Sequence, residues 1–244
     1  MKKTVLITGG SRGIGRASAQ LFAQQGCNVA INYLHSQQAA MDLAAGLTGE
    51  GCQVITCQAD VSSREQVAAM VGEVQERFGA IEILINNAGI AQQKMFTDIT
   101  TEDWDAMLAV NVKGIFNCCQ AVVPGMISRK QGKIINLASI WGLTGASCEV
   151  HYSTAKAAVI GFTKALAREL GPSNIQVNCV APGIIDTDMN ASLLEDDRCR
   201  LIEATPLMRL GTPQDIAYAL WFLASEQADF LTGQVLSPNG GFVI

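Results

Sequence analysis

One stretch decides the fold class of this 244-residue chain: Thr4-Val5-Leu6-Ile7-Thr8-Gly9-Gly10-Ser11-Arg12-Gly13-Ile14-Gly15. A β-branched run of strand length leads directly into a glycine-rich turn, and apolar residues at helical spacing follow the turn. Glycines in such a turn allow positive φ and let the backbone approach a pyrophosphate, which the N-terminus of the helix attracts. The stretch therefore predicts a strand–turn–helix unit that binds a dinucleotide. The alternative interpretation is a glycine-rich turn without a ligand.

The alternation of apolar runs and helical segments continues to the end of the chain. A helix is expected where apolar residues keep helical spacing from Val67 to Phe78, and Gly79 closes it. Further strands are predicted at residues 28–33, 53–56, 81–85, 133–137, 175–180 and 234–237. Strands that are apolar on both faces and alternate with amphipathic helices form parallel sheets covered on both sides. We therefore predict one α/β domain over residues 1–244.

The composition excludes several classes of protein. Hydrophobic residues make up 49% and charged residues 16%, which excludes a disordered chain and a coiled coil. A net charge of -5 counts against nucleic acid as the main partner, because neutralising phosphates needs a basic face. No apolar run reaches the roughly 18 residues that span a membrane, and glycines interrupt the first run too early for a signal peptide. We therefore expect a cytoplasmic protein without a membrane partner.

The cysteines and histidines form no recognisable metal or disulfide pattern. The eight cysteines include no Cys-x-x-Cys pair, and neither His35 nor His151 lies at metal-ligand spacing from a cysteine. Small buried thiols are the simpler interpretation in a chain that is neither short nor secreted. We expect no structural metal and no disulfide.

Residues 183–212 are the exception to the alternating pattern, with weak periodicity and a patch of mixed charge from Glu195 to Arg200. An irregular insertion of this length in a compact domain is usually functional or mobile. It directly follows the predicted sixth strand, and ligands of open parallel sheets bind beyond the carboxyl ends of the strands. We therefore predict a substrate lid, with a solvated surface excursion as the alternative.

The end of the predicted second strand indicates which dinucleotide binds. Sheets that bind NAD usually end this strand with an acidic residue for the ribose hydroxyls, whereas here it ends Ile31-Asn32-Tyr33 without a carboxylate. Arg12 lies in the glycine-rich turn, where its guanidinium could pair with a 2′-phosphate. The pattern favours NADPH over NADH. The alternative is that Arg12 is only a solvated loop charge.

A tyrosine and a lysine four residues apart indicate acid–base chemistry. Tyr152 and Lys156 are expected one turn apart on the same face of a helix. A phenol with a pKa of about 10 is a poor acid–base catalyst at neutral pH until a nearby ammonium stabilises the phenolate. Ser139 follows the predicted fifth strand, where its hydroxyl could hold a substrate carbonyl. Taken alone, the pair has a second interpretation, a core tyrosine beside a surface lysine.

With these residues in place, the sequence resembles the short-chain dehydrogenase/reductase family from about Lys3 to Ile244. The resemblance rests on motifs in the family's order: Thr8-Gly9-x3-Gly13-Ile14-Gly15, Asp60-Val61, Asn86-Asn87-Ala88-Gly89, Asn111, Ser139, Tyr152 with Lys156, and Pro182-Gly183 followed by Thr187. It implies a Rossmann-type three-layer domain with a parallel sheet of about seven strands. It also implies a homotetramer, the common assembly in the family.

The resemblance further implies a role for each site residue in carbonyl reduction. Tyr152 donates a proton to the carbonyl oxygen that Ser139 holds. Lys156 lowers the pKa of the tyrosine and binds the nicotinamide ribose, and Asn111 anchors a water that links the lysine to solvent. NADP is expected to bind to Gly9, Ser11, Arg12, Gly13, Ile14, Gly15, Asn32, Tyr33, Asp60, Val61, Asn87, Ala88, Gly89, Tyr152, Lys156, Pro182, Gly183, Ile185 and Thr187. All four catalytic positions are intact, which disfavours the alternative of a binding or regulatory protein that keeps the pocket without turnover.

Three kinds of carbonyl substrate are open at this point. Within the family the chain most resembles the 3-oxoacyl-[acyl-carrier-protein] reductases of fatty-acid synthesis, through residues 11–16, 186–189 and 232–241. It departs from them before the catalytic tyrosine, where Ser147-Cys148-Glu149-Val150-His151 replaces a small polar stretch. The loop at 145–150 also resembles the reductases assigned to 5-aminopentanone groups on elongation factor P. Another small ketone or a sugar is the third alternative.

Glu149 and His151 are the candidate substrate-binding residues in that departure. A Glu149 carboxylate that faces the cleft would disfavour an anionic substrate and attract an amine. Otherwise it is a carboxylate that interacts with the dipole at the start of a helix. His151 adjoins Tyr152, but neighbours on a helix point about 100° apart. We therefore expect His151 to be structural or to face the substrate rather than to catalyse.

Overall fold

The computed structural model describes residues 2–188 and 195–244. Its strands form one parallel sheet of seven strands in the order β3-β2-β1-β4-β5-β6-β7. They are β1 (Thr4–Ile7), β2 (Asn28–Tyr33), β3 (Val54–Gln58), β4 (Ile83–Asn86), β5 (Gly132–Leu137), β6 (Ile175–Val180) and β7 (Val235–Leu236). The predicted α/β fold with a single parallel sheet is confirmed, and β3 and β4 begin slightly later than predicted.

The strand order reverses between β1 and β4, which pair with each other in parallel. The chain continues from β1 to β2 on one side of this point and from β4 to β5 on the other. Such a reversal opens a crevice beyond the carboxyl ends of the strands, where ligands of doubly wound sheets bind. The glycine-rich turn after β1 and Asn87-Ala88-Gly89 after β4 both lie at this edge.

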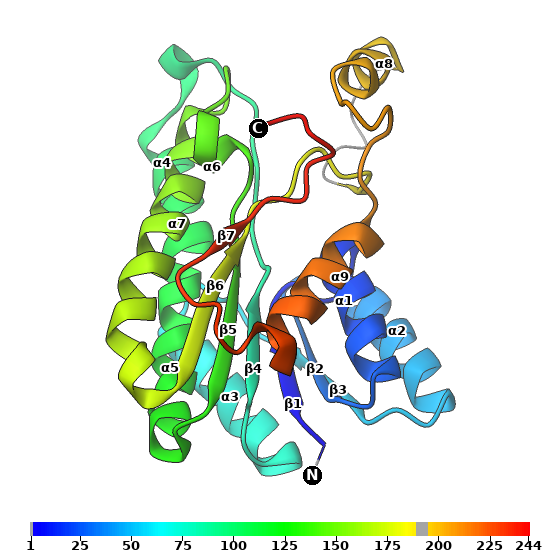
Figure 1. Cartoon of the computed structure of the whole chain (residues 1–244), viewed down its shortest axis with the longest axis vertical. Helices are drawn as coiled ribbons and strands as arrows, with labels where there is room; N and C mark the ends of the chain where they lie inside the picture. Colours follow the sequence, from blue (N-terminus) through cyan, green and yellow to red (C-terminus); the bar gives the residue numbers. More distant parts are fainter. Residues whose placement is uncertain (1, 189–194) are drawn as a thin grey trace.

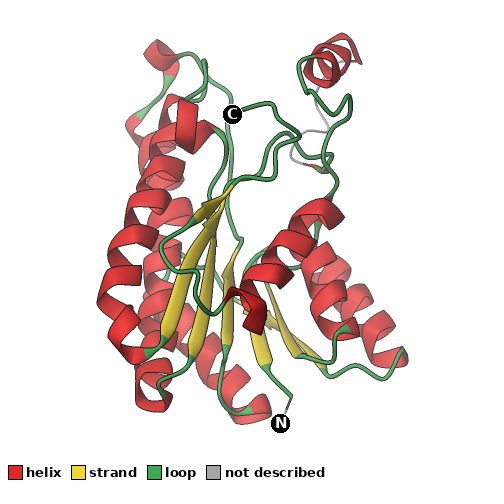
Figure 2. Ribbon diagram, in the orientation of Figure 1, coloured by secondary structure: helices red, strands yellow, loops and turns green. Residues whose placement is uncertain are grey.

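Helices cover both faces of the sheet, as Figures 1 and 2 show. One face carries α1 (Gly13–Gln24), α2 (Gln37–Gly49) and α9 (Pro213–Ala224). The opposite face carries α3 (Arg64–Phe78), α5 (Gly114–Arg129) and α7 (Val150–Leu170). On that side α4 (Thr101–Leu108), the π-helical turn η2 (Ala109–Lys113) and α5 follow one another without a break. The short elements are η1 (Phe96–Asp98), α6 (Trp141–Thr144), η3 (Gly171–Ser173), α8 (Glu195–Glu203) and η5 (Glu226–Ala228).

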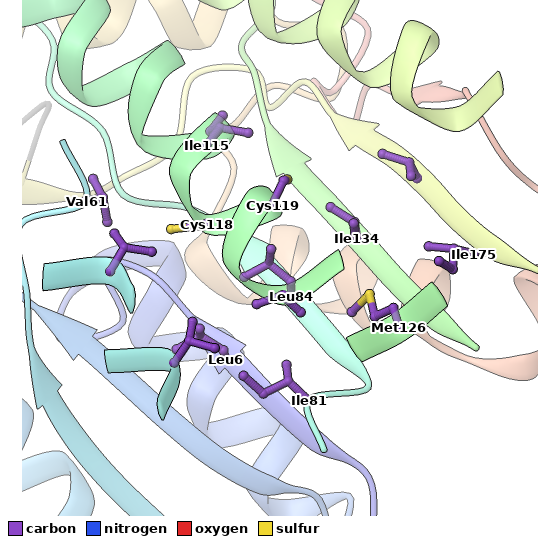
Figure 3. Packing of buried hydrophobic residues seen from close by; sticks show 14 of the residues in the cluster. Leu6, Val61, Ile81, Leu84, Ile115, Cys118, Cys119, Met126, Ile134 and Ile175 are labelled. Atoms are coloured by element: carbon purple, nitrogen blue, oxygen red, sulfur yellow. The ribbon is translucent and has the colours of Figure 1, made fainter. Parts of the chain in front are cut away.

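The hydrophobic core has one layer on each face of the sheet. Figure 3 shows part of one layer, where Leu84 and Ile134 of the sheet meet Cys119 and Met126 of α5. Side chains alternate between the layers along a strand, so Leu6 of β1 belongs to this layer and its neighbours Val5 and Ile7 belong to the other. Because both faces are buried, the strands read as continuous apolar runs in the sequence.

The segment Thr101–Arg129 is long and apolar enough to cross a membrane by length and composition alone. However, 44% of its most apolar window is buried inside the protein, where α5 packs against the sheet. Core helices of soluble proteins pass the same test, so the segment is weak support for a membrane span.

The structure corrects the prediction that residues 183–212 are irregular, because α8 lies within this segment. Acidic residues occupy the first turn of α8, where they stabilise the N-terminus of a helix. None of its residues is buried. Its half-buried side combines Asp197 and Arg198 with Leu201 and Ile202, so no apolar stripe at helical spacing marks the helix in the sequence. Residues 189–194 of this segment, with Met189 of the Asp-Thr-Asp-Met motif, lie outside the described residues.

Candidate active site

The glycine-rich turn joins β1 to α1 and is held by side chains from β2 and from the segment after β4. The N–H of Gly9, which has φ of 61°, donates to Oδ1 of Asn32 (3.2 Å). The amide of Asn87 donates to the carbonyls of Thr8 and Gly9 (both 2.9 Å). A Cβ on Gly15 would lie 2.3 Å from the carbonyl oxygen of Gly9, so only glycine permits this close approach. The N-terminus of α1 therefore borders the turn, which fits the pyrophosphate of a dinucleotide.

The residues predicted to distinguish NADPH from NADH lie beside this turn. Arg12 immediately precedes α1, and its exposed guanidinium lies 3.6 Å from the Asp188 carboxylate. Asn32 is buried and also donates to the carbonyl of Ala59 (3.0 Å), so it supports the turn and the loop after β3 together. Tyr33 is likewise buried. Arg12 is thus an exposed cation next to the turn, whereas Asn32 and Tyr33 support the turn from within the fold.

Asp60 and Val61 follow β3, and Val61 is held against α5, on the face of the sheet opposite to α1. An oxygen of Asp60 accepts from the N–H of Ser62 (2.8 Å). The amide of Asn117 in α5 donates to the carbonyl of Val61 (2.9 Å). A Cβ on Gly114 would lie 2.7 Å from the Val61 side chain, so α5 and this loop are in close contact.

A cleft of about 520 Å³ opens at the carboxyl ends of the strands, a size typical of small-molecule sites. Its walls bring together most of the chemistry predicted from the sequence: Ile14, Asn87, Gly89, Asn111, Ser139, Glu149, Tyr152, Lys156, Pro182, Gly183, Ile185 and Thr187. Other predicted residues are not among its lining residues in the described part of the chain: Gly9, Ser11, Arg12, Gly13, Gly15, Asn32, Tyr33, Asp60, Val61, Ala88 and His151.

Tyr152 and Lys156 share one face of α7, as predicted. The ammonium of Lys156 lies 5.6 Å from the centre of the Tyr152 ring and donates to the carbonyl of Leu137 (2.9 Å). The hydroxyl of Ser139 lies close enough to the phenol to lower the pKa of Tyr152, and it accepts from the N–H of Trp141 (3.1 Å). A phenol, a hydroxyl and an ammonium therefore converge just beyond the end of β5, where two hydroxyls can hold one carbonyl oxygen.

Burial is the main influence on the pKa values of Tyr152 and Lys156. Burial raises the pKa of Tyr152 to about 12, and the Glu149 carboxylate adds to the rise while the Ser139 hydrogen bond opposes it. Burial also lowers the pKa of Lys156 to about 8. The net shift of the Tyr152 pKa is therefore upward in this structure, because desolvation of the phenol outweighs the other influences, and the stabilisation of a phenolate by Lys156 stays a prediction. At neutral pH the phenol keeps its proton, as a proton donor must.

Asn111 lies in η2, and π-helical turns are frequent at functional sites. Its amide nitrogen donates to the carbonyls of Ile90 and Met107 (both 3.0 Å). Its Oδ1 is buried and has no hydrogen-bond partner among the described residues. A Cβ on Gly89 would lie 2.6 Å from this oxygen and 3.5 Å from the nitrogen of Lys156, so the two groups are neighbours. A buried acceptor of this kind beside an ammonium fits the water site that the family resemblance implies.

The side chain of Glu149 faces the cleft and makes no capping hydrogen bond to the start of α7. Its carboxylate accepts from the amide of Gln93 (3.2 Å), and partial burial raises its pKa. His151 is buried, and its Nε2 lies 2.9 Å from Oε1 of Gln92. Gln92, Gln93 and Trp141 also line the cleft. These three residues were not predicted from the sequence. The two glutamines lie in a loop, where no periodic pattern exists, and only their position shortly after Asn-Asn-Ala-Gly could have indicated them.

The described residues hold no disulfide and no cluster of side chains suited to a metal. Residues 2–188 and 195–244 contain no group of three or more His, Cys, Asp or Glu side chains placed to hold a metal. All eight cysteines are free thiols. Burial raises the pKa of Cys57 and of Cys118 to about 12, so these thiols are not ionised at neutral pH.

Known proteins are similar to this chain along nearly its whole length. A sequence profile of the family described as enoyl-(acyl carrier protein) reductase matches residues 9–243. The 3-oxoacyl-[acyl-carrier-protein] reductase FabG of Chlamydia muridarum is 42% identical over 244 residues, which cover 99% of this chain and 97% of that protein. The protein of the same name from Staphylococcus epidermidis is 42% identical over 241 residues, which cover 99% of each chain.

A solved structure extends the similarity to the fold. The crystal structure of 3-oxoacyl-[acyl-carrier protein] reductase from Brucella melitensis matches with a TM-score of 0.94 at 34% sequence identity. The match covers 99% of this chain and 92% of that chain. The similarity therefore includes the sheet, the helices on both faces and the segments that form the cleft.

Proposed function

Because this chain belongs to the short-chain dehydrogenase/reductase family, we propose that it is an NADPH-dependent reductase of 3-oxoacyl groups carried on acyl carrier protein. Family membership makes it an oxidoreductase of ketones or alcohols that uses a nicotinamide cofactor. One observation carries the proposal. The hydroxyls of Ser139 and Tyr152 meet next to the buried ammonium of Lys156, which is an arrangement for holding and protonating a carbonyl oxygen. The relatives named for 3-oxoacyl substrates match from end to end, which favours C=O over C=C reduction.

Tyr152 is the proton donor in this proposal. The bound nicotinamide supplies hydride to the carbonyl carbon. As negative charge develops on the carbonyl oxygen, Ser139 and Tyr152 donate hydrogen bonds to it, and the phenol proton passes to the oxygen. Lys156, whose pKa of about 8 keeps it mostly protonated at neutral pH, stabilises the phenolate that remains. Asn111 holds the water through which the phenolate regains its proton.

Arg12 supports the preference for NADPH. Its guanidinium is exposed beside the turn, its ion pair with Asp188 is long, and β2 ends with the neutral residues Asn32 and Tyr33. A charge-assisted hydrogen bond contributes about 1.5–3 kcal/mol, so Arg12→Gln should weaken NADPH binding by about 10- to 100-fold. NADH binding should change little, because it carries no 2′-phosphate. Fluorescence titration with both cofactors tests this, and equal losses for both would contradict it.

Glu149 favours a second candidate function, the reduction of a ketone that carries an amine. Its carboxylate lines the same cleft as Tyr152 and its pKa is raised by partial burial, so the charged form gains from a cationic partner. A 5-aminopentanone group attached to elongation factor P is a substrate of this kind. The acyl-carrier proposal requires instead that a neutral acyl chain pass this carboxylate.

The test is oxidation of NADPH by the purified protein with an acetoacetyl thioester and with a short aminoketone. Tyr152→Phe should abolish turnover of both. Strong turnover of the thioester that is indifferent to Glu149→Gln supports the 3-oxoacyl function. Preference for the aminoketone that is lost in Glu149→Gln supports the second candidate. Cofactor binding without turnover of a broad panel of carbonyl compounds would refute both and leave a binding protein.

We also propose that the protein is a cytoplasmic homotetramer and that residues 183–212 form its substrate lid. The aromatic side chains of Tyr218, Phe222 and Phe230 are exposed and are the candidate contact residues of this assembly. Asp197 of α8 lines the cleft, which supports the lid. Light scattering on the purified protein and on Phe230→Asp tests the assembly, and a monomeric wild-type protein would refute it.

A further inference from the structure

Four polar side chains form a hydrogen-bonded chain beside the cleft, and the proposed reaction uses none of them. The ammonium of Lys94 donates to Oδ2 of Asp103 (2.5 Å), and the amide of Gln92 donates to Oδ1 of Asp103 (3.0 Å). Oε1 of Gln92 lies 2.9 Å from Nε2 of His151. The chain thereby connects the segment after β4, the first turn of α4 and the first turn of α7.

Asp103 fixes the direction of these hydrogen bonds. The ammonium of Lys94 and the N–H of Thr100 hold the pKa of Asp103 well below its usual range, so this carboxylate stays ionised and only accepts. Gln92 must therefore turn its NH₂ group toward Asp103 and its oxygen toward His151. It follows that Nε2 of His151 carries the ring proton and donates it to Gln92.

His151 depends on this one hydrogen bond. Its side chain is 0% exposed. Its Nδ1 is also buried and has no hydrogen-bond partner within the residues that the structure describes. Burial of polar nitrogens is unfavourable without partners, so the bond to Gln92 is the polar contact that offsets the cost of placing a histidine here.

The two glutamines transmit this contact to the cleft, which both of them line. Next to Gln92, the amide of Gln93 donates to the carboxylate of Glu149 (3.2 Å). The backbone N–H of Lys94 donates to the carbonyl of Cys148 (2.7 Å). Residues 92–94 are therefore tied to the start of α7 by three consecutive contacts, and these contacts set the wall of the cleft on the Glu149 side.

We propose that His151 is a positioning residue for substrate, which donates to Gln92 and thereby fixes the wall of the cleft that contacts the substrate beyond its reacting carbonyl. The proposal rests on the proposed ketone reductase function. His151 does not line the cleft, so its influence on the substrate passes through Gln92. Contacts away from the reacting atoms bind the ground state and the transition state alike, so their loss raises KM more than it lowers kcat.

The first test compares two substitutions of the histidine. His151→Leu removes the donor, whereas His151→Gln keeps an N–H that can reach Oε1 of Gln92. We expect His151→Leu to raise KM for the ketone about tenfold, equivalent to about 1.4 kcal/mol, with kcat and the Kd for NADPH nearly unchanged. His151→Gln should restore most of the affinity. Adding Gln92→Met to His151→Leu should raise KM little further, because both remove the same hydrogen bond.

The second test is ¹⁵N NMR of the imidazole, which needs no turnover. The chain has two histidines, so a His35→Gln background leaves only the signals of His151. We expect a protonated Nε2 and a bare Nδ1, and Gln92→Met should shift the ring toward the other tautomer.

Three results decide between the proposal and its failure. A wild-type ring protonated at Nδ1 with a bare Nε2 overturns the proposal. A His151→Leu protein with a lower Tm but an unchanged KM also overturns it, because this is what a purely structural residue would give. If the wild-type protein reduces no ketone, the proposed function fails. The NMR measurement of the His151 tautomer, with and without Gln92→Met, still decides whether His151 donates a hydrogen bond to Gln92.

Discussion

Gly89→Ala is the substitution for which the structure gives the sharpest expectation. A Cβ at this position would lie 2.6 Å from Oδ1 of Asn111 and 3.5 Å from the nitrogen of Lys156. Close carbon–oxygen contacts are normally about 3.3 Å, so the new methyl group would overlap the amide oxygen by about 0.7 Å. Backbone strain adds nothing to this effect, because Gly89 is not among the residues with positive φ.

Asn111 cannot move aside at low cost. Its amide donates to the carbonyls of Ile90 and Met107 (both 3.0 Å), and its side chain is fully buried. Overpacking of a rigid site costs about 1–3 kcal/mol, and about 2 kcal/mol in a chain of this size lowers Tm by about 4–8 °C. Because the displaced amide neighbours Lys156, kcat should fall by about 10- to 100-fold in the protein that remains folded.

Gly72→Ala is the matched control for this experiment. Gly72 is exposed in α3, and a Cβ there meets nothing within 4 Å. The same chemical change should therefore stabilise the protein, by up to about 1 kcal/mol, and leave kcat unchanged. Thermal unfolding and initial rates of NADPH oxidation measure both variants. If Gly89→Ala keeps the wild-type Tm and kcat, Asn111 does not lie where we place it. A lower Tm with an unchanged kcat keeps the contact but refutes its link to catalysis.

Three other contacts lead to measurable expectations. From about pH 8 to 10.5 the free energy of unfolding of the wild-type protein should rise relative to that of Lys156→Met. In this range the lysine of the unfolded chain still binds a proton that the buried lysine of the folded protein has released. Urea unfolding at several pH values measures both proteins, and a constant difference between them would contradict this. Asn32→Asp should destabilise the protein by about 3 kcal/mol, because it places a buried carboxylate against the carbonyl oxygen of Ala59, where the amide of Asn32 now donates. An unchanged midpoint of urea unfolding would show that the amide donor is dispensable. Arg198→Gln removes a two-point ion pair with Asp186 (3.0 and 2.7 Å) that joins α8 to the segment after β6. It should raise KM a few-fold at low salt, and the difference should vanish at high salt; equal KM values at low salt would argue against the lid.

The fold and the Tyr152–Lys156 pair could be predicted because both depend on local patterns. A strand buried on both faces is a continuous apolar run, and residues four apart on a helix share a face wherever that helix lies. The helix α8 could not be predicted in this way, since its half-buried side mixes charged and apolar residues and leaves no hydrophobic period in the sequence. The placement of Glu149 was left undecided for a similar reason, because a residue just before a helix can turn toward the helix axis or toward the cleft.

The chain from Lys94 to His151 shows a second limit of sequence reasoning. Its members come from a loop and from the first turns of two helices, and they meet only because the sheet brings α4 and α7 together. No fixed spacing in the sequence corresponds to such a meeting. A glutamine in a loop and a histidine beside a catalytic tyrosine each have many possible partners, and only the packed structure selects one.

The tyrosine pKa shows why spacing alone misjudges chemistry. The distance between Tyr152 and Lys156 follows from the helix, but the free energy of each charged form depends on how much water surrounds it, and both side chains are buried. Burial moves the two pKa values toward a neutral phenol and a neutral amine, to about 12 and about 8. At neutral pH the pair is therefore a phenol beside an ammonium that is held at some cost. That pair can give up a proton when charge develops on a carbonyl oxygen, whereas the reverse reaction must first ionise a phenol that burial protects. The two pKa values thus follow from burial, which the packed structure sets and the helical spacing does not.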